Sequence, residues 1–391
     1  MDQEIRFKVL TLNCWGIPYI SKNKNERIKA IAEQLSSNDY DVVCLQEVWS
    51  AKDYDMIKNK VKKKLTYSHY FYSGVLGSGI CVFSKHPIQD VMFYQWSLNG
   101  YVHKIHHGDW FGGKGVGLCR LRVNDANVNV YVAHLHAEYD CENDEYSAHR
   151  ILQAFDTAQF IRMTEQGADV TILGGDLNTG PEDLAYRIIS GVASLTDSCS
   201  THHSDKGTSE CANNSYSCRK VANKLPQGKR IDHILYLGSK NFKVDVVNCY
   251  QPFPERIPNK NFSFSDHEAV ETEFKFTRGV YEVNNIDIRS TLKEASHVCS
   301  EALQNVRKQR FWYTMMSIVL VIPIIYSISL DITFQSIGAI IGLNILRLFI
   351  TALICYSLFM SSIWNNVEQN ALKAGCLEME IHLNYINSKY S

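Results

Sequence analysis

A chain of 391 residues, 45% hydrophobic and 21% charged, is long enough for one large domain with a sizeable core and an appendage. Its formal net charge of −1 excludes the strongly basic surface that most nucleic-acid-binding proteins carry. Residues 1–7 show no basic start followed by an apolar run, so we expect no signal peptide and a folded part in the cytosol. The 12 cysteines are scattered, which predicts reduced thiols.

Residues 5 to about 276 alternate short β-rich runs with polar turns and a few patterns of helical spacing. This mixture predicts a layered α/β domain. The polar stretch 198–228 predicts a long loop of the kind that is usually functional or mobile. Helical spacing occurs over 25–36, 53–65 and 146–166, and the predicted strands cover 6–13, 41–46, 80–84, 128–134, 170–174, 231–237 and 269–276.

Glu47 directly follows the predicted strand 41–46, an apolar run that ends abruptly in Gln46 and Glu47. Such a run is typical of a buried strand whose C-terminal end delivers a carboxylate to the rim of a sheet, although a capping or surface glutamate would give the same pattern. Four further polar segments adjoin predicted strands. They contain Asn13, His134 with His136, Asp176 with Asn178, and Asp232 with the closing pair Asp266 and His267.

These residue types fit one chemical task, the attack of water on a phosphodiester. The anionic substrate needs charge neutralisation, a base for the water and donors for the oxygens of the transition state. A divalent ion held by Glu47 with help from Asn13 would neutralise the charge through the oxygen ligands that Mg²⁺ prefers. Asp266 is a third candidate ligand, and Mn²⁺ is expected to substitute for Mg²⁺.

His267 is the predicted general base. A carboxylate on its other ring nitrogen would orient the imidazole and stabilise the imidazolium, and Asp232 is the candidate. Asp176 and Asn178 occupy alternate positions just past an apolar strand, so both can point into one pocket and there position the water and a phosphoryl oxygen. His134 and His136 are expected to point the same way on a strand.

Each segment alone has an ordinary alternative, since Asp176 could lie in a turn and His134 could be a core histidine. Five segments in this order at strand ends resemble the endonuclease/exonuclease/phosphatase superfamily over residues 5 to about 276. Three shorter segments and a paired apolar C-terminus resemble the membrane-anchored neutral sphingomyelinases. These segments are SKHPI (84–88), HHGDWFGGK (106–114) and HLHAEY (134–139).

The resemblance implies a four-layered α/β sandwich, in which two packed mixed β-sheets are flanked by helices. It also implies Mg²⁺-dependent hydrolysis of sphingomyelin to ceramide and phosphocholine on the cytosolic leaflet. It supports Glu47 with Asn13 as the ion site, Asp176 and Asn178 as groups that position water and phosphate, and His267 as the base.

The same resemblance favours His134 over His136 as the catalytic or phosphate-binding histidine. Asp109 and Lys114 match a spacing in neutral sphingomyelinases, where the lysine approaches the substrate and the aspartate pairs with it in another state. A plain surface salt bridge is the alternative for this pair.

The chain changes character beyond residue 280. An amphipathic linker helix is predicted over 281–310, and it ends in the basic cluster Arg307, Lys308 and Arg310. Residues 311–330 carry no charge and, at about 1.5 Å per residue, span the roughly 30 Å hydrocarbon core of a bilayer. This segment predicts a transmembrane helix.

A second apolar segment contains Arg347, whose cost in the bilayer is smallest near a helix end, so we expect a span over 344–364. Two spans, 311–364, predict a hairpin. Its basic flank predicts that the catalytic domain, 1–280, and the tail, 365–391, face the cytosol from the endoplasmic reticulum or the plasma membrane. Gly338 and Gly342 fit a small-xxx-small contact, which leaves a transmembrane dimer open.

Other functions stay open. An enzyme with the same metal site could act on another lipid phosphodiester, as an inositol-phosphosphingolipid phospholipase C would, or on a lysophospholipid such as lyso-platelet-activating factor. A catalytically silent membrane scaffold would keep the fold, but the intact polar set argues against it. A nuclease, and binding of nucleic acid in general, are disfavoured by the near-zero net charge and the predicted spans.

Overall fold

The computed structural model describes residues 4–104, 107–140, 142–200, 206–279, 287–330 and 336–389. The chain divides into two units, Met1–Thr291 and Leu292–Ser391. Within the described residues, all strands belong to the first unit and the second unit is helical.

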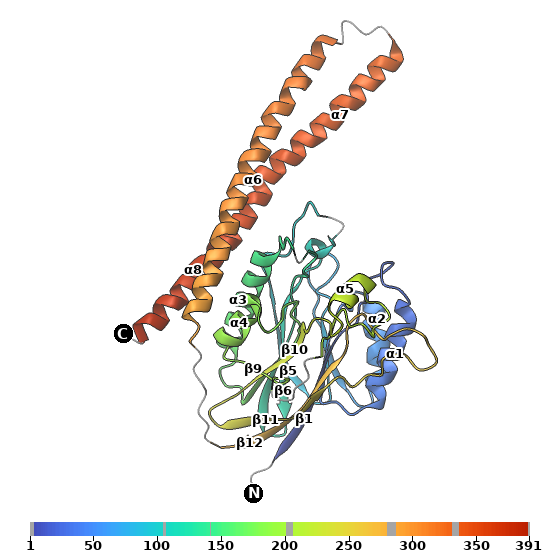
Figure 1. Ribbon diagram of the computed structural model, residues 1–391, viewed down its shortest axis with the longest axis vertical. Helices are drawn as coiled ribbons and strands as arrows, with labels where there is room; N and C mark the ends of the chain where they lie inside the picture. Colours follow the sequence, from blue (N-terminus) through green and yellow to red (C-terminus); the bar gives the residue numbers. More distant parts are fainter. Residues whose placement is uncertain are drawn as a thin grey trace. The chain divides into compact units, whose positions relative to one another are not determined.

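In the described part of the first unit, the strands form two six-stranded mixed sheets (Figure 1). The first sheet contains β1 (Ile5–Asn13), β2 (Val42–Gln46), β3 (Tyr67–Tyr70), β4 (Cys81–Ser84), β11 (Phe242–Tyr250) and β12 (Val270–Arg278), in the order β11-β12-β1-β2-β4-β3. The second contains β5 (Ile88–Gln95), β6 (Gly115–Val123), β7 (Ala126–His134), β8 (Val170–Asp176), β9 (Thr196–Asp197) and β10 (Asp232–Gly238), in the order β5-β6-β7-β8-β10-β9.

Alternation of side chains along β1 separates two hydrophobic cores. Phe7 and Val9 face the core between the two sheets, where they join residues such as Val130 of β7. Leu10 and Leu12 face the opposite way and pack in a second core with the helices on the outer face of the first sheet. The two sheets therefore pack face to face, with helices outside them.

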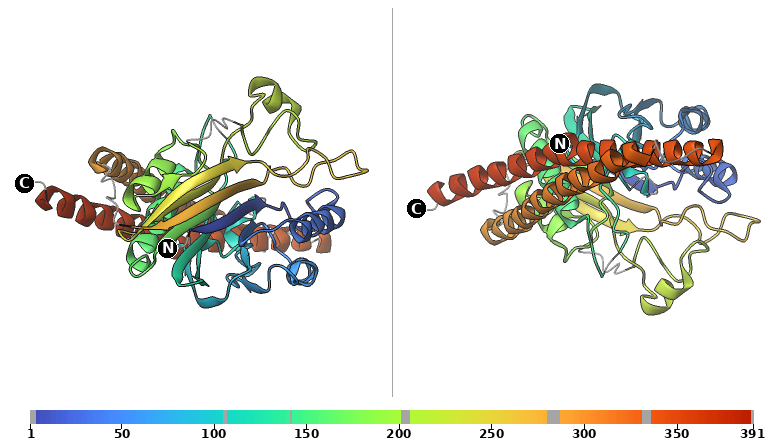
Figure 2. Two further views of the ribbon diagram at one scale, coloured as in Figure 1. Left: turned by 90° about the horizontal axis from the view of Figure 1, so that it is seen from below. Right: turned by 90° about the horizontal axis from the view of Figure 1, so that it is seen from above.

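Helices cover both outer faces of this pair of sheets (Figures 1 and 2). The helices at the first sheet are α1 (Lys24–Ser37) and α2 (Ala51–Val61), and those at the second are α3 (Ser147–Thr164) and α4 (Leu184–Val192). The arrangement confirms the predicted four-layered α/β sandwich. The stretch 198–228, predicted as a loop, contains the short helix α5 (Arg219–Lys224). Elsewhere in the catalytic unit, residues Asp109–Phe111 form a 3-10 turn, η2.

The expectation that the cysteines are reduced thiols is wrong for two of them. Cys199, which directly follows β9, and Cys249 of β11 form a disulfide, with their Cα atoms 5.4 Å apart. This separation lies within the range that a disulfide can bridge. The scattered spacing in the sequence gave no sign of the pairing, because the residues are brought together only by the packing of the two sheets. No other disulfide occurs among the described cysteines.

The second unit is a pair of long antiparallel helices. The first is α6 (Arg289–Leu330), and the second runs through α7 (Ile337–Phe359), a π-helical turn, η3 (Met360–Trp364), and α8 (Asn365–Lys389). Both are long and apolar enough to cross a membrane. The division of this region at residues 310 and 364 stays a prediction, and Asp331, expected at the turn between the spans, lies outside the described residues.

Two groups of hydrogen bonds connect the helices of this unit. Arg347 of α7 donates from Nε to Ser327 Oγ of α6 at 2.9 Å and from a second nitrogen to the Ser327 carbonyl, so this arginine is satisfied inside an apolar segment. Asn365 of α8 donates to the carbonyl of Val306 at 2.7 Å. The predicted linker helix and the predicted tail therefore lie side by side.

Candidate active site

Strand register brings the polar strand ends into line. In the parallel pair β7–β8, His134 lies opposite Asp176, and in the antiparallel pair β8–β10, Asp176 lies opposite Asp232. In the first sheet, Asn13 lies opposite Gln46, the residue before Glu47. Each sheet thus presents its polar groups at one edge of the sandwich.

Asn13 connects the two edges. Its Nδ2 donates to Glu47 Oε1 at 3.2 Å and to Asp176 Oδ2 at 2.9 Å.

His134 Nε2 lies 3.4 Å from Asp176 Oδ2 and 4.0 Å from Glu47 Oε1. Burial lowers the pKa of His134 well below its ordinary value, and Lys114 adds to this effect, so the imidazole is neutral. Four groups that lie far apart in the sequence therefore form one cluster.

Glu47 is an acid in an unfavourable environment. Burial raises its pKa from 4.5 to about 7, and the neighbouring charge of Asp266 acts in the same direction. Its second oxygen, Oε2, is buried and has no hydrogen-bond partner among the described residues. An unsatisfied buried carboxylate oxygen is costly unless a cation or donor reaches it.

The backbone at Glu47 is held in a strained conformation. Glu47 has a φ of 54°, and Trp15 and Asn178, both close to the cluster in sequence, have φ values of 44° and 47°. The Gly16 amide donates to the Glu47 carbonyl at 3.0 Å. A Cβ at Gly16 would lie 2.3 Å from that oxygen, so only glycine permits the contact. Strain of this kind concentrates at functional sites.

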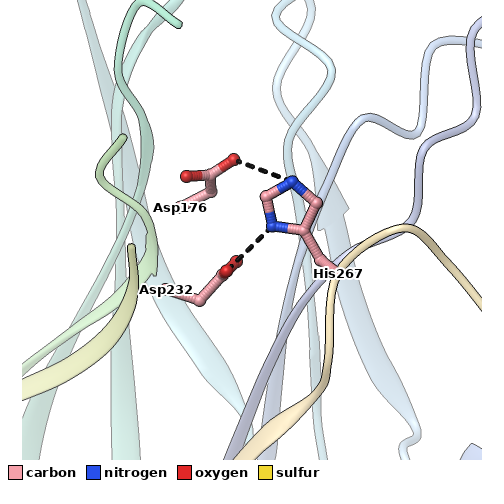
Figure 3. A group of neighbouring side chains, drawn as sticks. All are labelled: Asp176, Asp232 and His267. Carbon is pink, nitrogen blue, oxygen red and sulfur yellow. Dashed lines mark hydrogen bonds and ion pairs between the residues drawn. The ribbon is translucent and has the colours of Figure 1, made fainter. Parts of the chain in front are cut away.

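His267 lies three residues before the start of β12 and forms a dyad with Asp232 (Figure 3). Its Nδ1 is 2.8 Å from Asp232 Oδ2, and its Nε2 is 3.9 Å from Asp176 Oδ2. Burial alone would lower the pKa of His267, but the charges of Asp232 and Asp176 raise it well above its ordinary value. Burial and Asp232 also raise the pKa of Asp176.

Thr208, inside the predicted loop, supports this dyad. Its Oγ1 accepts from the amides of Ile231 at 3.1 Å and Asp232 at 3.0 Å. Its carbonyl accepts from the amide of Glu268 at 2.6 Å. One residue therefore fixes the backbone on both sides of the His267–Asp232 pair. The sequence contained no signal for this role.

Lys114 and Asn178 converge on one carbonyl oxygen. Asn178 Nδ2 donates to the Leu135 carbonyl at 2.9 Å, and Lys114 Nζ lies 3.4 Å from the same oxygen. Lys114 also pairs with Asp109 at 2.7 Å, and both side chains are buried. The alternative of a surface salt bridge is therefore wrong for this pair.

The expectation that His134 and His136 point the same way is also wrong. Strand β7 ends at His134, so the alternation of side chains does not extend to His136. The His136 ring instead lies 3.5 Å from Asp109 and stacks on Tyr146. Burial lowers the pKa of His136 to about 4. This histidine belongs to the aromatic surroundings of Asp109.

Arg27 is a second residue that sequence reasoning missed. Its guanidinium is buried and donates to the carbonyls of Cys14 at 2.8 Å, Trp15 at 2.6 Å and Phe264 at 3.2 Å. These carbonyls flank Asn13 on one side and the 265–267 segment on the other. Arg27 therefore holds together the two segments that carry Asn13 and Asp266.

The donor set fits a divalent cation. Asp176, Asp232 and His267 place one ligand atom each within 4.8 Å of one another. Within this trio, the dyad hydrogen bond already engages His267 Nδ1. Glu47, with its unsatisfied oxygen, and Asp266 add carboxylates beside Asn13. A cluster rich in carboxylate and amide oxygens matches the preference of hard divalent ions.

The model of the Endonuclease/Exonuclease/phosphatase family matches residues 10–267 of this chain, a range that includes the polar cluster at the strand ends. Sphingomyelinase C from Streptomyces griseocarneus shares the fold, with a TM-score of 0.53, 19% identity and coverage of 69% of this chain and 99% of that protein. A beta toxin variant from Staphylococcus aureus with bound magnesium ions has a TM-score of 0.51, 19% identity and coverage of 68% and 99%.

Sequence relatives narrow the class. The Drosophila melanogaster protein named "Putative neutral sphingomyelinase" is 36% identical over 97% of this chain and 98% of its own length. Human sphingomyelin phosphodiesterase 2 is 40% identical over 68% and 64%. The inositol phosphosphingolipids phospholipase C of Schizosaccharomyces pombe is 33% identical over 70% and 69%. The chain belongs to the neutral sphingomyelinases of the Endonuclease/Exonuclease/phosphatase family, and it is a phosphoric diester hydrolase.

Proposed function

We propose that this enzyme hydrolyses sphingomyelin to ceramide and phosphocholine in a phospholipase C-type reaction that depends on Mg²⁺. The observation that carries the proposal is an unsatisfied buried carboxylate at Glu47 close to the oriented imidazole of His267. Together they provide a cation site and a base for water, which phosphodiester hydrolysis requires. The names of the fly and human relatives support the choice of lipid.

Glu47, Asn13 and Asp266 are the proposed ligands of the ion. When bound, the ion supplies positive charge that polarises the phosphodiester. The amide of Asn13 faces the carboxylates with Nδ2, while its Oδ1 accepts from the Trp15 amide at 2.9 Å. Ligation through oxygen therefore requires this amide to turn. The carboxylates also explain why Mn²⁺, which accepts oxygen ligands, should substitute.

His267 is the proposed general base. Its Nε2 takes a proton from water, and the water oxygen attacks phosphorus as the bond to the ceramide oxygen breaks. Asp232 holds the other ring nitrogen and stabilises the imidazolium that forms. Asp176 lies 3.9 Å from Nε2 and can orient the attacking water. The departing ceramide oxygen takes a proton from solvent and so becomes a primary hydroxyl, and His267 returns to solvent the proton that it took; phosphocholine is the other product.

Lys114, Asn178 and His134 are the proposed donors to the phosphoryl oxygens. Neutral His134 can donate a hydrogen bond but carries no charge, so Lys114 is the cation among these three. Lys114 reaches the substrate only when it leaves Asp109, with which it pairs in this structure. We therefore propose that the Asp109–Lys114 pair breaks when substrate binds.

An inositol phosphosphingolipid is a second candidate substrate, because the S. pombe relative of that name is 33% identical to this chain. Its scissile bond is the same ceramide phosphodiester, so the ion site and the base would serve both reactions. Recognition of the headgroup decides between the two lipids.

We also propose that α6 and the α7–α8 helix cross a bilayer as a hairpin, since both are long and apolar enough to do so. The basic residues Arg307, Lys308 and Arg310 favour the cytosolic side for the catalytic unit. The endoplasmic reticulum and the plasma membrane are the candidate locations.

Headgroup release from a panel of lipids tests the substrate. Full-length protein in mixed micelles should release phosphocholine from sphingomyelin when Mg²⁺ is added, and chelation should abolish release. Robust release of a headgroup from phosphatidylcholine or an inositol phosphosphingolipid, with none from sphingomyelin, would overturn the choice of substrate.

A pair of histidine variants controls this assay. His267→Ala should reduce kcat by at least about 100-fold because the base is lost. His297→Ala, a change of the same kind on the exposed surface of α6, should leave kcat unchanged. Equal activity in both variants would remove His267 from the mechanism.

A further inference from the structure

Two loops of the catalytic unit expose large apolar side chains to solvent. In the loop between β1 and α1, Tyr19 is 108% exposed and Ile20 is 69% exposed. In the loop between β3 and β4, Tyr72, Val75 and Leu76 are exposed, and Val75 reaches 79%. We call these the rim loops, residues 17–22 and 72–77. Isolated exposed apolar residues are common, but two clusters at loop tips indicate a contact surface.

Both rim loops lie near Trp49, two residues beyond Glu47. Trp49 and Tyr19 line the same cavity of about 910 Å³, together with Ser50 and Lys52. The Trp49 ring also packs against Gly79, two residues beyond the second rim loop, where a Cβ would meet it at 3.1 Å. The Gly79 carbonyl accepts from the Val48 amide at 2.9 Å. The exposed apolar tips therefore flank the segment that carries the proposed ion ligand.

Both rim loops are anchored by hydrogen bonds at their bases. Arg27 Nε donates to the Lys22 carbonyl at 2.9 Å in the first loop. In the second, the Leu76 amide donates to the Phe111 carbonyl at 3.1 Å, and Gly113 donates to the Gly77 carbonyl at 3.0 Å. Tyr19 also has a left-handed backbone, with a φ of 66°. The apolar tips are thus held outward by a fixed framework.

The charges near the rim loops suit a phospholipid surface. Lys22, two residues beyond Ile20, and Lys52, which lines the cavity with Tyr19, are exposed. Lys24 and Glu26 of the same cavity are paired with Asp53 and Lys260. Apolar side chains that enter the acyl boundary, ringed by lysines at headgroup level, are the usual chemistry of an interfacial contact. A protein partner would not need this combination next to an active-site opening, whereas a lipid substrate does.

We propose that the rim loops dock the catalytic unit onto the bilayer, inserting Tyr19, Ile20, Val75 and Leu76 beside the active site. This inference rests on the proposed function, because only an enzyme that draws its substrate from a bilayer gains from it. Docking at the rim shortens the path of a lipid phosphodiester to Glu47. The loops contribute to substrate capture and not to the chemical step.

The test compares one substrate in two physical states. Full-length enzyme in vesicles of phosphatidylcholine, phosphatidylserine and sphingomyelin is compared with enzyme acting on short-chain sphingomyelin below its micellar concentration. The variant Ile20→Ser, Val75→Ser, Leu76→Ser should lose at least tenfold in kcat/KM on vesicles and less than twofold on the monomeric lipid. The control, Val91→Ser with Met92→Ser on β5, removes similarly exposed apolar groups and should change neither.

Equal losses on both substrates, or no loss on vesicles, would overturn the proposal. A second readout does not depend on catalysis. A nitroxide at Ile20→Cys, in a Cys218→Ser, Cys355→Ser background, should lie at acyl-chain depth, and one at Met92→Cys should lie in water. If wild type cleaves no sphingomyelin in either state, the proposed function fails, and the nitroxide depth still decides whether the rim loops dock.

Discussion

Burial of Glu47 near Asp266 leaves two carboxylates close together where water is largely excluded. The pKa of Glu47 is raised mainly by burial and then by Asp266, and the pKa of Asp266 is itself raised by burial. The fold therefore holds a repulsion that a divalent cation would relieve. The side chain that destabilises the metal-free protein is thus the proposed ligand of the ion.

Stability of the metal-free protein should therefore depend on pH. The pKa of Glu47 is 4.5 when unperturbed and about 7 in the fold, so the folded state holds this proton more tightly between those values. Stability should fall as pH rises through this window, by about 3 kcal/mol, and then level off. Chemical denaturation at a series of pH values with a chelator measures the slope.

Two substitutions make this test specific. Glu47→Gln should flatten the slope and abolish stabilisation by added Mg²⁺, which for wild type is about 2.7 kcal/mol at one hundred times Kd. Glu33→Gln, at an exposed position of α1, should keep both properties. An unchanged slope in Glu47→Gln would assign the titration to another group.

Asp232→Asn should move the pH dependence of catalysis. Asp232 raises the pKa of His267, so its removal lowers that pKa. A base works when it is unprotonated, and the ascending limb of kcat/KM should shift to lower pH while the plateau falls about 100-fold. Initial rates from pH 5 to 9, a range of about four units, test the shift. A limb at the wild-type position would contradict the dyad.

At the scale of elements, the site could be predicted where it depends on strand ends. Glu47 follows a run of apolar residues, Asp176 ends one and Asp232 begins one. Strand register then aligns Asp176 and Asp232 with His134. The layered α/β class followed from the same runs, whereas the four-layered sandwich was implied by the family resemblance. These features are local, so the sequence alone carries them.

Other elements left no local signal. Strand β5 is largely exposed and lacks alternation, and β6 begins with glycines at 115 and 117, so neither gives a clear strand pattern. Thr208 and Arg27 act through hydrogen bonds to backbone groups distant in the sequence, which only the folded chain brings near. The disulfide at Cys199 was missed for the same reason.

The support given by Thr208 can be tested separately from the dyad. Thr208→Val keeps the shape but removes the acceptor of two buried amides, which should cost about 1–3 kcal/mol of stability. Because Asp232 is displaced, kcat should fall about tenfold or more with little change in KM. Thr208→Ser restores the oxygen and should restore both. Failure of serine to rescue would show that packing, not the hydrogen bonds, matters.

At the scale of the whole chain, the two helices of the second unit pair in two ways. They form a uniformly apolar pair toward one end and a pair of mixed composition toward the other. Toward one end Arg347 bonds Ser327, and toward the other Asn365 bonds Val306. Beyond Asn365, buried residues of both helices, including Leu292 and Leu372, continue the pair where the sequence is no longer uniformly apolar. Because both ends are fixed by hydrogen bonds, neither helix can slide or rotate alone.

The π turn at Met360–Trp364 sits between these two kinds of pair. A π turn contains one more residue than the α-helix would, and in an α-helix one residue corresponds to about 100° of rotation. The extra residue therefore sets the rotational phase of α8 relative to α7, so that each half presents its own packing face to α6.

Deletion of Ser362 should convert the turn to α-helix and rotate α8 by about 100°, away from Val306. Cys376 of α8, a hydrogen-bond neighbour of Cys299 on α6, would leave that position. Mild oxidation should crosslink the two cysteines in wild type and in Ser362→Ala, but not in the deletion. Persistent crosslinking would mean that the helices adjust their phase elsewhere. A single inserted residue thus rotates the second half of one continuous helix, so that its uniformly apolar half and its mixed half each turn their own packing residues toward α6.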